Sequence, residues 1–431
     1  MTGNTILILN ASVYTLTLLI YYIRSKSFNV GVFLLLLYSV AAWSSVLYYN
    51  HKLFIYSYSY SSITVEPFIY LYVVLMLFLY PFLKFKTNEI LKIEAPNKRK
   101  MLLLIKILTI LQLFIILIQL PNVADIITSA NWGELRNSQY DLEYKFWFSS
   151  IPIVSRFYGL VAGILPISIV LSFYFYFIDT YKNKWQSWFF YSTIIVVVLN
   201  QIVVAGRGSL LLFIVYIFSV FLLFYKKIPE RKRKLIIKLS VVPIAIFIVF
   251  FVSVSQSRFG DAVSFETYRY AGESMINFNG KLYYELKDST NGNAYFVLLT
   301  NIFDRDNAFK TVIEKWNYIE NITGVDAHYF YTFIGAFLLE FGKIITFLIA
   351  IIFCIISSWV LRKNKTTTLP IILYYSIWGY MFSSGIFFFN LQNATGNFTI
   401  ILLIFLMFYL KNKNAKKIYY ENRSSYLSRS R

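Results

Sequence analysis

The sequence has little charge, one cysteine and two histidines. Charged residues make up 14% of the 431 residues, whereas a soluble domain carries about a quarter. Hydrophobic residues account for 58% of the chain and aromatic residues for 20%, and the mean hydropathy is +0.59. This composition excludes a soluble globular protein and predicts a chain that resides in a lipid bilayer.

The scarcity of metal-binding residue types excludes several kinds of site. Cys354 lies inside an apolar run, so the chain has neither a disulfide framework nor a cysteine metal site. With only His51 and His328, a histidine-rich metal centre is also excluded. The sequence contains no GxGxxG, P-loop or HExxH motif. We therefore expect no metal and no cofactor.

Long apolar runs are abundant. A membrane-spanning helix needs about 20 mostly apolar residues, and the sequence predicts about eleven such helices in an all-α, polytopic bundle. The runs are Thr5–Ile23, Asn29–Tyr49, Pro67–Leu83, Met101–Leu120, Phe157–Ile178, Trp188–Ala205, Ser209–Tyr225, Ile236–Ser255, Ile344–Leu361, Leu369–Asn390 and Phe398–Leu410.

The net charge of +20 is distributed unevenly among the connections. Alternate connections, together with the C-terminal tail, hold 27 of the 41 lysines and arginines. Cytoplasmic loops carry such an excess, so these segments are predicted to be cytoplasmic, with the N-terminus outside and the C-terminus inside. The basic excess is then a topology signal, and no nucleic-acid partner is implied.

Two outward segments are too long to be simple turns. Residues 121–156 form an outward loop of mixed charge, and residues 256–342 form a large outward loop rich in aromatic residues. Connections of this length are usually functional when they are not disordered. We expect the large loop to fold into short amphipathic helices, with the segment 330–341 lying at the membrane interface, and residues 1–431 to form one polytopic domain.

Outward arginines are the first candidates for chemistry, because the planar guanidinium matches phosphate oxygens. Arg207 lies in an Ala-Gly-Arg-Gly-Ser turn between two apolar runs, and Arg258 and Arg269 begin the large loop. Snorkelling to lipid phosphates or pairing with nearby acids would also account for them. His328 is a candidate proton acceptor near neutral pH.

Aromatic and amide side chains accompany these groups in the large loop. Such side chains suit a glycan, because aromatic faces pack against sugar C–H groups and amides bind hydroxyls. The ordinary interfacial aromatic belt is the alternative explanation. The candidate glycan-binding residues are Tyr268, Tyr270, Asn277, Asn279 and Tyr284.

The sequence resembles the O-antigen polymerases, also called oligosaccharide repeat unit polymerases. The resemblance rests on the number of spans, the large outward loop in the second half and the Gly-Arg-Gly turn at 206–208. It also rests on the stretch from His328 to Gly342 and on an arginine followed ten residues later by glycine, as in Arg269 to Gly280. The related O-antigen ligases carry an outward histidine that resembles His328.

This resemblance implies a metal-independent glycosyltransferase in the cytoplasmic membrane of a bacterium. The enzyme would join undecaprenyl-diphosphate-linked oligosaccharides into a surface polysaccharide such as O-antigen or capsule, with a flippase and a chain-length regulator as partners. Arg207, Arg258 and Arg269 would bind the diphosphate, and Arg269 would belong to the catalytic group with His328 or Glu273 as the base.

Two other functions remain open from the sequence. One is a flippase or exporter of lipid-linked glycan, although the apolar spans lack the buried charges expected of a coupled transporter. The other is a related ligase or a different lipid-sugar transferase, including a metal-dependent one with an acidic pair in the first outward loop. That loop contains only Glu66.

Overall fold

The computed structural model describes residues 1–54, 63–128, 146–179, 183–204, 207–303, 309, 311–362 and 366–411, and it is mostly helical. Each of the eleven apolar runs falls mainly on helix among the described residues, although the run Leu369–Asn390 is helical only to Ser384. The long helices are α1 (Gly3–Ser25), α2 (Val30–Tyr49), α4 (Val65–Lys84), α5 (Lys98–Thr128), α9 (Lys184–Val204), α11 (Glu230–Phe259) and α16 (Thr332–Val360). The shorter ones are α7 (Pro152–Ala162), α8 (Leu165–Phe173) with the π-helical turn η3 (Tyr174–Ile178), α10 (Arg207–Phe224), α17 (Leu369–Ser384) and α18 (Ala394–Tyr409).

The described helices confirm an all-α membrane protein but not eleven spans. Six helices are long and apolar enough to cross a membrane, namely α1, α2, α4, α5, α9 and α16. The pair α7 and α8, bent by 42°, gives a seventh if it counts as one span. By contrast, α17 and α18 have 16 residues each, which is about 24 Å of helix against a hydrocarbon core of about 30 Å.

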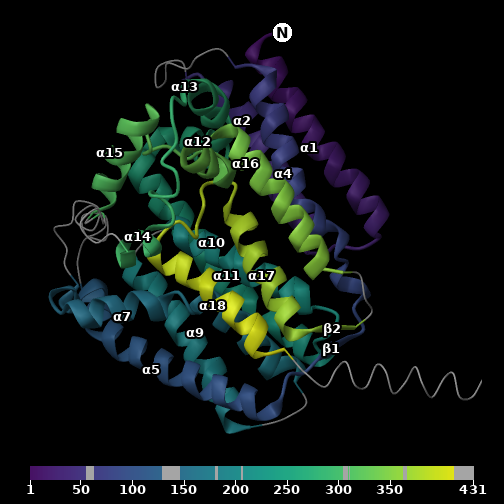
Figure 1. Ribbon diagram of the computed structural model, residues 1–431, viewed down its shortest axis with the longest axis vertical. Helices are drawn as coiled ribbons and strands as arrows, with labels where there is room; N and C mark the ends of the chain where they lie inside the picture. Colours follow the sequence, from purple (N-terminus) through teal and green to yellow (C-terminus); the bar gives the residue numbers. More distant parts are fainter. Residues whose placement is uncertain are drawn as a thin grey trace, which may run out of the picture.

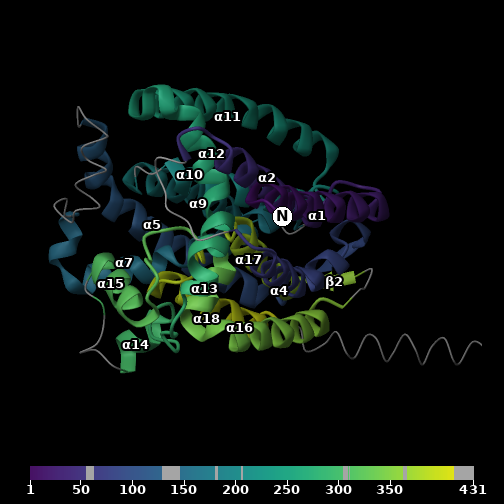
Figure 2. The same cartoon turned by 90° about the horizontal axis from the view of Figure 1, so that it is seen from above.

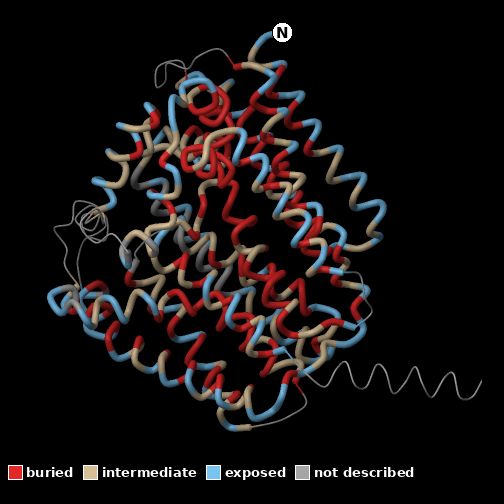
Figure 3. Tube along the Cα trace, viewed as in Figure 1, coloured by how far each residue is buried: buried red, intermediate tan, exposed pale blue. Residues whose placement is uncertain are grey.

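The outer surface of the bundle is apolar. On α1, for example, Leu16 is 58% exposed and Ile23 is 70% exposed, and on α18 Phe408 is 72% exposed. Figure 3 shows exposed positions along the free side of α1 and buried positions where helices face one another. A soluble protein would place polar residues on this surface, so its apolar character supports the membrane assignment.

Polar bonds link helices inside the bundle. The Gln112 amide on α5 donates to Thr193 Oγ1 on α9 over 2.9 Å and accepts a bond from Ser192. Further along α5, Gln119 Nε2 donates to Tyr158 Oη on α7 at 2.8 Å. Such bonds replace those that water would make in a soluble protein, and they fix the register of neighbouring helices.

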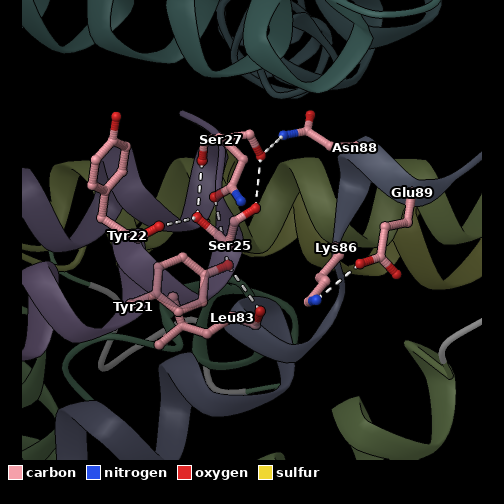
Figure 4. A network of polar contacts seen from close by, with 9 residues as sticks. Tyr21, Tyr22, Ser25, Ser27, Leu83, Lys86, Asn88 and Glu89 are labelled. Atoms are coloured by element: carbon pink, nitrogen blue, oxygen red, sulfur yellow. Dashed lines mark hydrogen bonds and ion pairs between the residues drawn. The ribbon is translucent and has the colours of Figure 1, made fainter.

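The charge pattern predicts that several segments lie on the cytoplasmic side of the membrane. These segments meet at one end of the molecule, which we call the basic end. Strand β1 (Lys92–Glu94) pairs in parallel with β2 (Thr366–Thr368), and Lys227 Nζ donates to Thr87 O in the 3₁₀ turn η1 (Thr87–Glu89). Figure 4 shows a network at this end in which Asn88 donates to Ser27 and Tyr21 donates to Leu83 O.

Elements from the predicted outward connections lie toward the opposite end, here called the polar end. In Figure 1 the N-terminus, α12 and α13 lie at the top, far from β1 and β2. Figure 2 shows α11 along one face of the bundle and α16 along the opposite face. The connecting elements are the 3₁₀ turns η2 (Trp147–Ser150) and η4 (Gly260–Ala262), α12 (Val263–Asn277), the π-helical turn η5 (Phe278–Leu282), α13 (Tyr283–Glu285), α14 (Val297–Phe303) and α15 (Val312–Thr323).

The segment that follows His328 differs from its sequence-based expectation. Residues 331–340, which were expected to lie at the membrane interface, are all buried, and residues 332–340 form the first part of α16. Gly342 then breaks this helix with a φ of 71°, a conformation that favours glycine. Carbonyls on both sides of the break accept bonds from side chains: Thr346 Oγ1 donates to Phe337 O and Tyr70 Oη donates to Lys343 O.

The first predicted outward loop, residues 121–156, begins further along the chain than the sequence suggested. Helix α5 continues through Pro121 to Thr128, and α7 starts at Pro152. Much of the predicted loop, residues 129–145, lies outside the described residues. The described part of residues 121–156 is therefore mainly helical.

One close contact holds α12 against α2. A Cβ at Gly272 would lie 2.3 Å from Ser45 N and 2.5 Å from Ser44 C. Real Cβ atoms do not approach backbone so closely, so only glycine permits this approach. The polar end of α2 and the helix α12 are packed backbone to backbone at this position.

We expect Gly272→Ala to destabilise the protein, because α12 must move away from α2. Overpacking of this kind costs about 1–3 kcal/mol. Gly379→Ala is the matched control, since Gly379 is also helical and buried but has no atom within 4 Å of its added Cβ. Thermal unfolding of the purified variants in detergent measures both effects. Equal melting temperatures for the two variants would contradict the close-contact interpretation.

Candidate functional site

Three charged side chains lie on consecutive turns of α12. Arg269 is flanked by Glu266 three residues before it and Glu273 four residues after it, so all three face the same side of the helix. Arg269 Nη2 lies 2.6 Å from Glu266 Oε2, and Arg269 Nε lies 4.0 Å from Glu273 Oε2. The structure thus brings together two of the predicted site residues, Arg269 and Glu273, and adds Glu266, which we call the α12 charge cluster.

Burial differs across the α12 charge cluster. The side chain of Arg269 retains 24% of its exposure and that of Glu273 only 7%. Burial is the main cause that raises the pKa of Glu273 to about 7; the negative charge of Glu266 contributes to this rise, and the positive charges of Arg269 and Lys281 oppose it. Glu273 therefore exchanges a proton near neutral pH, which is the property required of a general base or acid.

Aromatic residues surround the cluster on α12. The Arg269 guanidinium lies 5.0 Å from the ring centroid of Tyr270, and Tyr270 is 38% exposed. Tyr268 contacts His51 in the connection between α2 and α4, with ring centroids 6.5 Å apart. Tyr270 is thus available to a ligand beside Arg269, whereas Tyr268 is partly covered by its contact with His51.

The side chains of the two predicted amide ligands, Asn277 and Asn279, bond to backbone groups of the protein. Asn277 and Asn279 are both 0% exposed. Asn277 Nδ2 donates to Phe330 O at 3.2 Å, while Asn279 accepts a bond from Thr64 N at 3.0 Å and donates to Thr64 O at 2.7 Å. Because these bonds hold backbone segments in place and the side chains are buried, we remove both residues from the glycan-binding set.

A second polar group lies where α13 meets the start of α4. Glu66 accepts bonds from Tyr283 Oη at 3.0 Å and Tyr284 Oη at 2.9 Å. Lys343 Nζ lies 3.8 Å from the centroid of Tyr283, and Tyr284 is 49% exposed. Sequence reasoning selected Tyr284 but gave Glu66 and Lys343 no role in the site, because nothing in the sequence shows that α4, α13 and the break in α16 converge.

His328 lies in a separate acidic setting. Its Nδ1 is 2.7 Å from Asp326 Oδ1, its ring centroid is 4.5 Å from that of Trp316, and the side chain is largely exposed. Glu320, Asp326 and His328 place ligand atoms within 4.8 Å of one another, so among the described residues this group has the spacing to hold a metal ion. The segment after His328 reaches α12 and η5 through Phe330 O and through Tyr329, whose centroid lies 3.6 Å from Lys281 Nζ.

The other two predicted arginines, Arg207 and Arg258, lie in parts of the chain that the structure describes only in part. Arg207 begins α10 and Arg258 lies one residue before the end of α11, but their side chains are outside the described residues, as are residues 205–206 of the predicted Gly-Arg-Gly turn. Their diphosphate-binding role therefore stays a prediction.

A buried acid also organises the large connection. Glu340, which is 1% exposed, accepts bonds from Thr290 Oγ1, Ala294 N and Tyr295 N. Lys315 Nζ lies 4.4 Å from the Tyr295 centroid, and burial lowers the pKa of Lys315 to about 8. Sequence reasoning missed Glu340, although an acid in an apolar run two residues before a glycine was a visible signal.

Comparison with protein families, curated proteins and solved structures finds no match to this chain.

The raised pKa of Glu273 predicts a dependence of stability on pH. Between the ordinary carboxyl value of 4.5 and the folded value of about 7, the native state holds a proton that the unfolded chain releases. The free energy of unfolding should therefore fall as pH rises through this window, by about 1.4 kcal/mol per unit at most.

We expect Glu273→Gln to flatten this fall, because the amide does not titrate. The measurement is the melting temperature of the detergent-solubilised protein from pH 5 to pH 8. Glu285→Gln, at an exposed position on α13, is the control and should retain the wild-type slope. An unchanged slope in Glu273→Gln would show that another group causes the dependence.

Proposed function

We propose that this protein is a glycosyltransferase that polymerises undecaprenyl-diphosphate-linked oligosaccharide repeat units into a surface polysaccharide. The observation that carries the proposal is the α12 charge cluster, which sets a guanidinium beside a buried carboxyl whose pKa is about 7. Together these groups offer an anion-binding charge and a proton acceptor at one end of a membrane bundle. The resemblance to O-antigen polymerases in layout and spacing supports the same reaction.

The proposed orientation places the basic end in the cytoplasm of a bacterium and the polar end outside. Lysine and arginine are concentrated in cytoplasmic connections of membrane proteins, and the segments that hold this excess contact one another at the basic end. The α12 charge cluster then faces the side on which completed lipid-linked repeat units are joined. About eleven spans, with the N-terminus outside and the C-terminus inside, belong to this proposal.

In the proposed reaction, a hydroxyl of the acceptor repeat unit attacks the anomeric carbon of the donor glycan. A new C–O bond forms, the bond to the diphosphate breaks with its electron pair, and undecaprenyl diphosphate leaves. The acceptor proton passes to Glu273, or to His328 if that residue is the base. Arg269, with Arg207 and Arg258, stabilises the charge that builds on the diphosphate, as fixed guanidiniums do without a metal.

The exposed aromatic residues are proposed to bind the glycan. Tyr270 lies beside Arg269 and Tyr284 lies over the Glu66 group, so each presents an aromatic face at the polar end. Tyr268 contributes less because His51 covers part of its ring. A chain-length regulator and a flippase are the partners that this function requires.

We expect Arg269→Ala and Arg207→Ala to abolish long glycan chains while the protein stays inserted and abundant. The reason is the loss of a positive charge that the leaving diphosphate needs in the transition state, a loss of about 10²- to 10³-fold in rate. Gel analysis of surface glycan in the producing cells measures this. Lys234→Ala removes an exposed positive charge at the basic end and should leave chain length normal.

The same cells distinguish the proposed polymerase from the alternatives. Deletion of the gene should leave single repeat units on the surface without polymer, whereas repeat units trapped inside would indicate a flippase. Polymer present but not transferred to its final acceptor would indicate a ligase. Loss of purified activity on addition of a chelator would favour a metal-dependent transferase and the Glu320, Asp326 and His328 group.

The pH profile of the purified enzyme should identify the base. If Glu273 accepts the proton, kcat/KM rises with pH and reaches half its maximum near pH 7, because only the ionised carboxylate of the free enzyme can accept. Glu273→Gln should then lose about 10²-fold or more in rate above pH 7, while His328→Gln keeps the wild-type midpoint. A profile that disappears in His328→Gln and persists in Glu273→Gln would reverse this assignment.

A further inference from the structure

A cavity at the basic end is lined by two lysines, amides and aromatic rings. Its volume is about 450 Å³, and its lining comes from η3, the start of α9 and the start of α11. The lining residues are Phe175, Tyr176, Asn183, Lys184, Gln186, Ser187 and Lys232. This size is in the range of small-ligand sites, and the cavity is separate from the α12 charge cluster.

The charges around the cavity favour an anion. Lys184 on α9 and Lys232 on α11 come from different helices and both line it. Glu230, the acid closest in sequence to Lys232, pairs with Lys234 at 2.8 Å. Asp179, an acid near the start of α9, is 9% exposed and accepts a bond from Gln186 Nε2 at 2.8 Å. Two ammonium groups from different helices therefore converge on one cavity.

The walls of the cavity place it at the level of lipid headgroups. Tyr176 stacks on Phe190 at a centroid distance of 4.1 Å, and its hydroxyl is 3.4 Å from that of Tyr191. Trp188 and Tyr191 are 61% and 53% exposed. Tyrosine and tryptophan concentrate at this depth in membrane proteins, so the lysines lie where lipid phosphates are found.

The chain geometry at the cavity depends on a π-helical turn. Helix α8 ends in η3, whose wider winding carries Phe175 and Tyr176 into the cavity wall. Lys232 Nζ lies 5.8 Å from the Tyr176 centroid and 5.9 Å from that of Phe177. Such turns often occur at functional sites, and here the turn sets aromatic rings next to a lysine that faces a polar cavity.

We propose that this cavity binds the phosphate of an anionic phospholipid headgroup, with Lys184 and Lys232 as the charged ligands and Asn183 and Ser187 as hydrogen-bonding groups. Basic pockets between helices on the cytoplasmic side of a membrane bind such headgroups. The aromatic walls contact the glycerol and the start of the acyl chains. This site rests on the orientation proposed above but not on the glycosyl transfer, and its test uses binding alone.

The test compares two double variants of the full-length protein in detergent by native mass spectrometry. Lys184→Gln with Lys232→Gln removes the cavity lysines. Lys234→Gln with Lys238→Gln removes two other lysines of α11 that do not line the cavity, so the change in net charge is the same. The probes are dioleoyl phosphatidylglycerol, dioleoyl phosphatidylcholine and inorganic phosphate.

The wild type should retain phosphatidylglycerol in preference to phosphatidylcholine. The cavity variant should bind phosphatidylglycerol about tenfold or more weakly, since a lysine near a membrane surface contributes about a fivefold factor, and the control variant should stay within about twofold of wild type. Equal weakening in both variants, or none in either, would overturn the proposal. Binding of inorganic phosphate that equals lipid binding would overturn the assignment to a lipid headgroup.

Discussion

The polar end of the bundle depends on how closely α12 approaches α2. Gly272 allows the two backbones to meet at Ser44 and Ser45, and this contact fixes the helix that carries Arg269 and Glu273. The same helix ends in Asn277 and continues into Asn279, whose amide holds both backbone groups of Thr64. Thr64 begins α4, so the position of Glu66 and of its two tyrosine partners follows from the same approach. The positions of the α12 charge cluster and of the Glu66 group therefore both depend on Gly272, and its substitution should affect both.

A second constraint comes from the need to satisfy backbone groups where water is absent. Near the break at Gly342, hydroxyl groups from α4 and from α16 itself donate to carbonyls of α16. Thr290 N also donates to Leu339 O, and Glu340 accepts the backbone N–H groups of Ala294 and Tyr295. The large connection is thus tied to the inside of the bundle by the very segment that the sequence suggested would lie on its surface.

These two constraints explain what the sequence could and could not predict. Apolar runs and the alternation of lysine and arginine are local patterns, so the helices and the two ends of the molecule were predictable from them. The burial of residues 331–340 was not, because their apolar character is equally consistent with an interfacial helix. Asn277 and Asn279 resemble ligand residues in sequence, and only the fold shows that their side-chain amides are hydrogen-bonded to backbone groups of Phe330 and Thr64. Arg269 and Glu273, four residues apart on one helix, are the part of the site that sequence spacing did place together.

The electrostatics of the α12 charge cluster couple proton and anion binding. With Glu273 protonated, the charges of Arg269 and Glu266 compensate each other across 2.6 Å, and the cluster is neutral. An anion that binds Arg269 competes with Glu266 for the guanidinium, and its negative charge disfavours ionisation of Glu273. Binding of an anion at Arg269 and binding of a proton at Glu273 therefore favour each other. When the anion leaves, the pKa of Glu273 falls back to about 7, and the proton is released to water above that pH. In the proposed polymerase, binding of the donor diphosphate would therefore raise the pH at which Glu273 is half ionised.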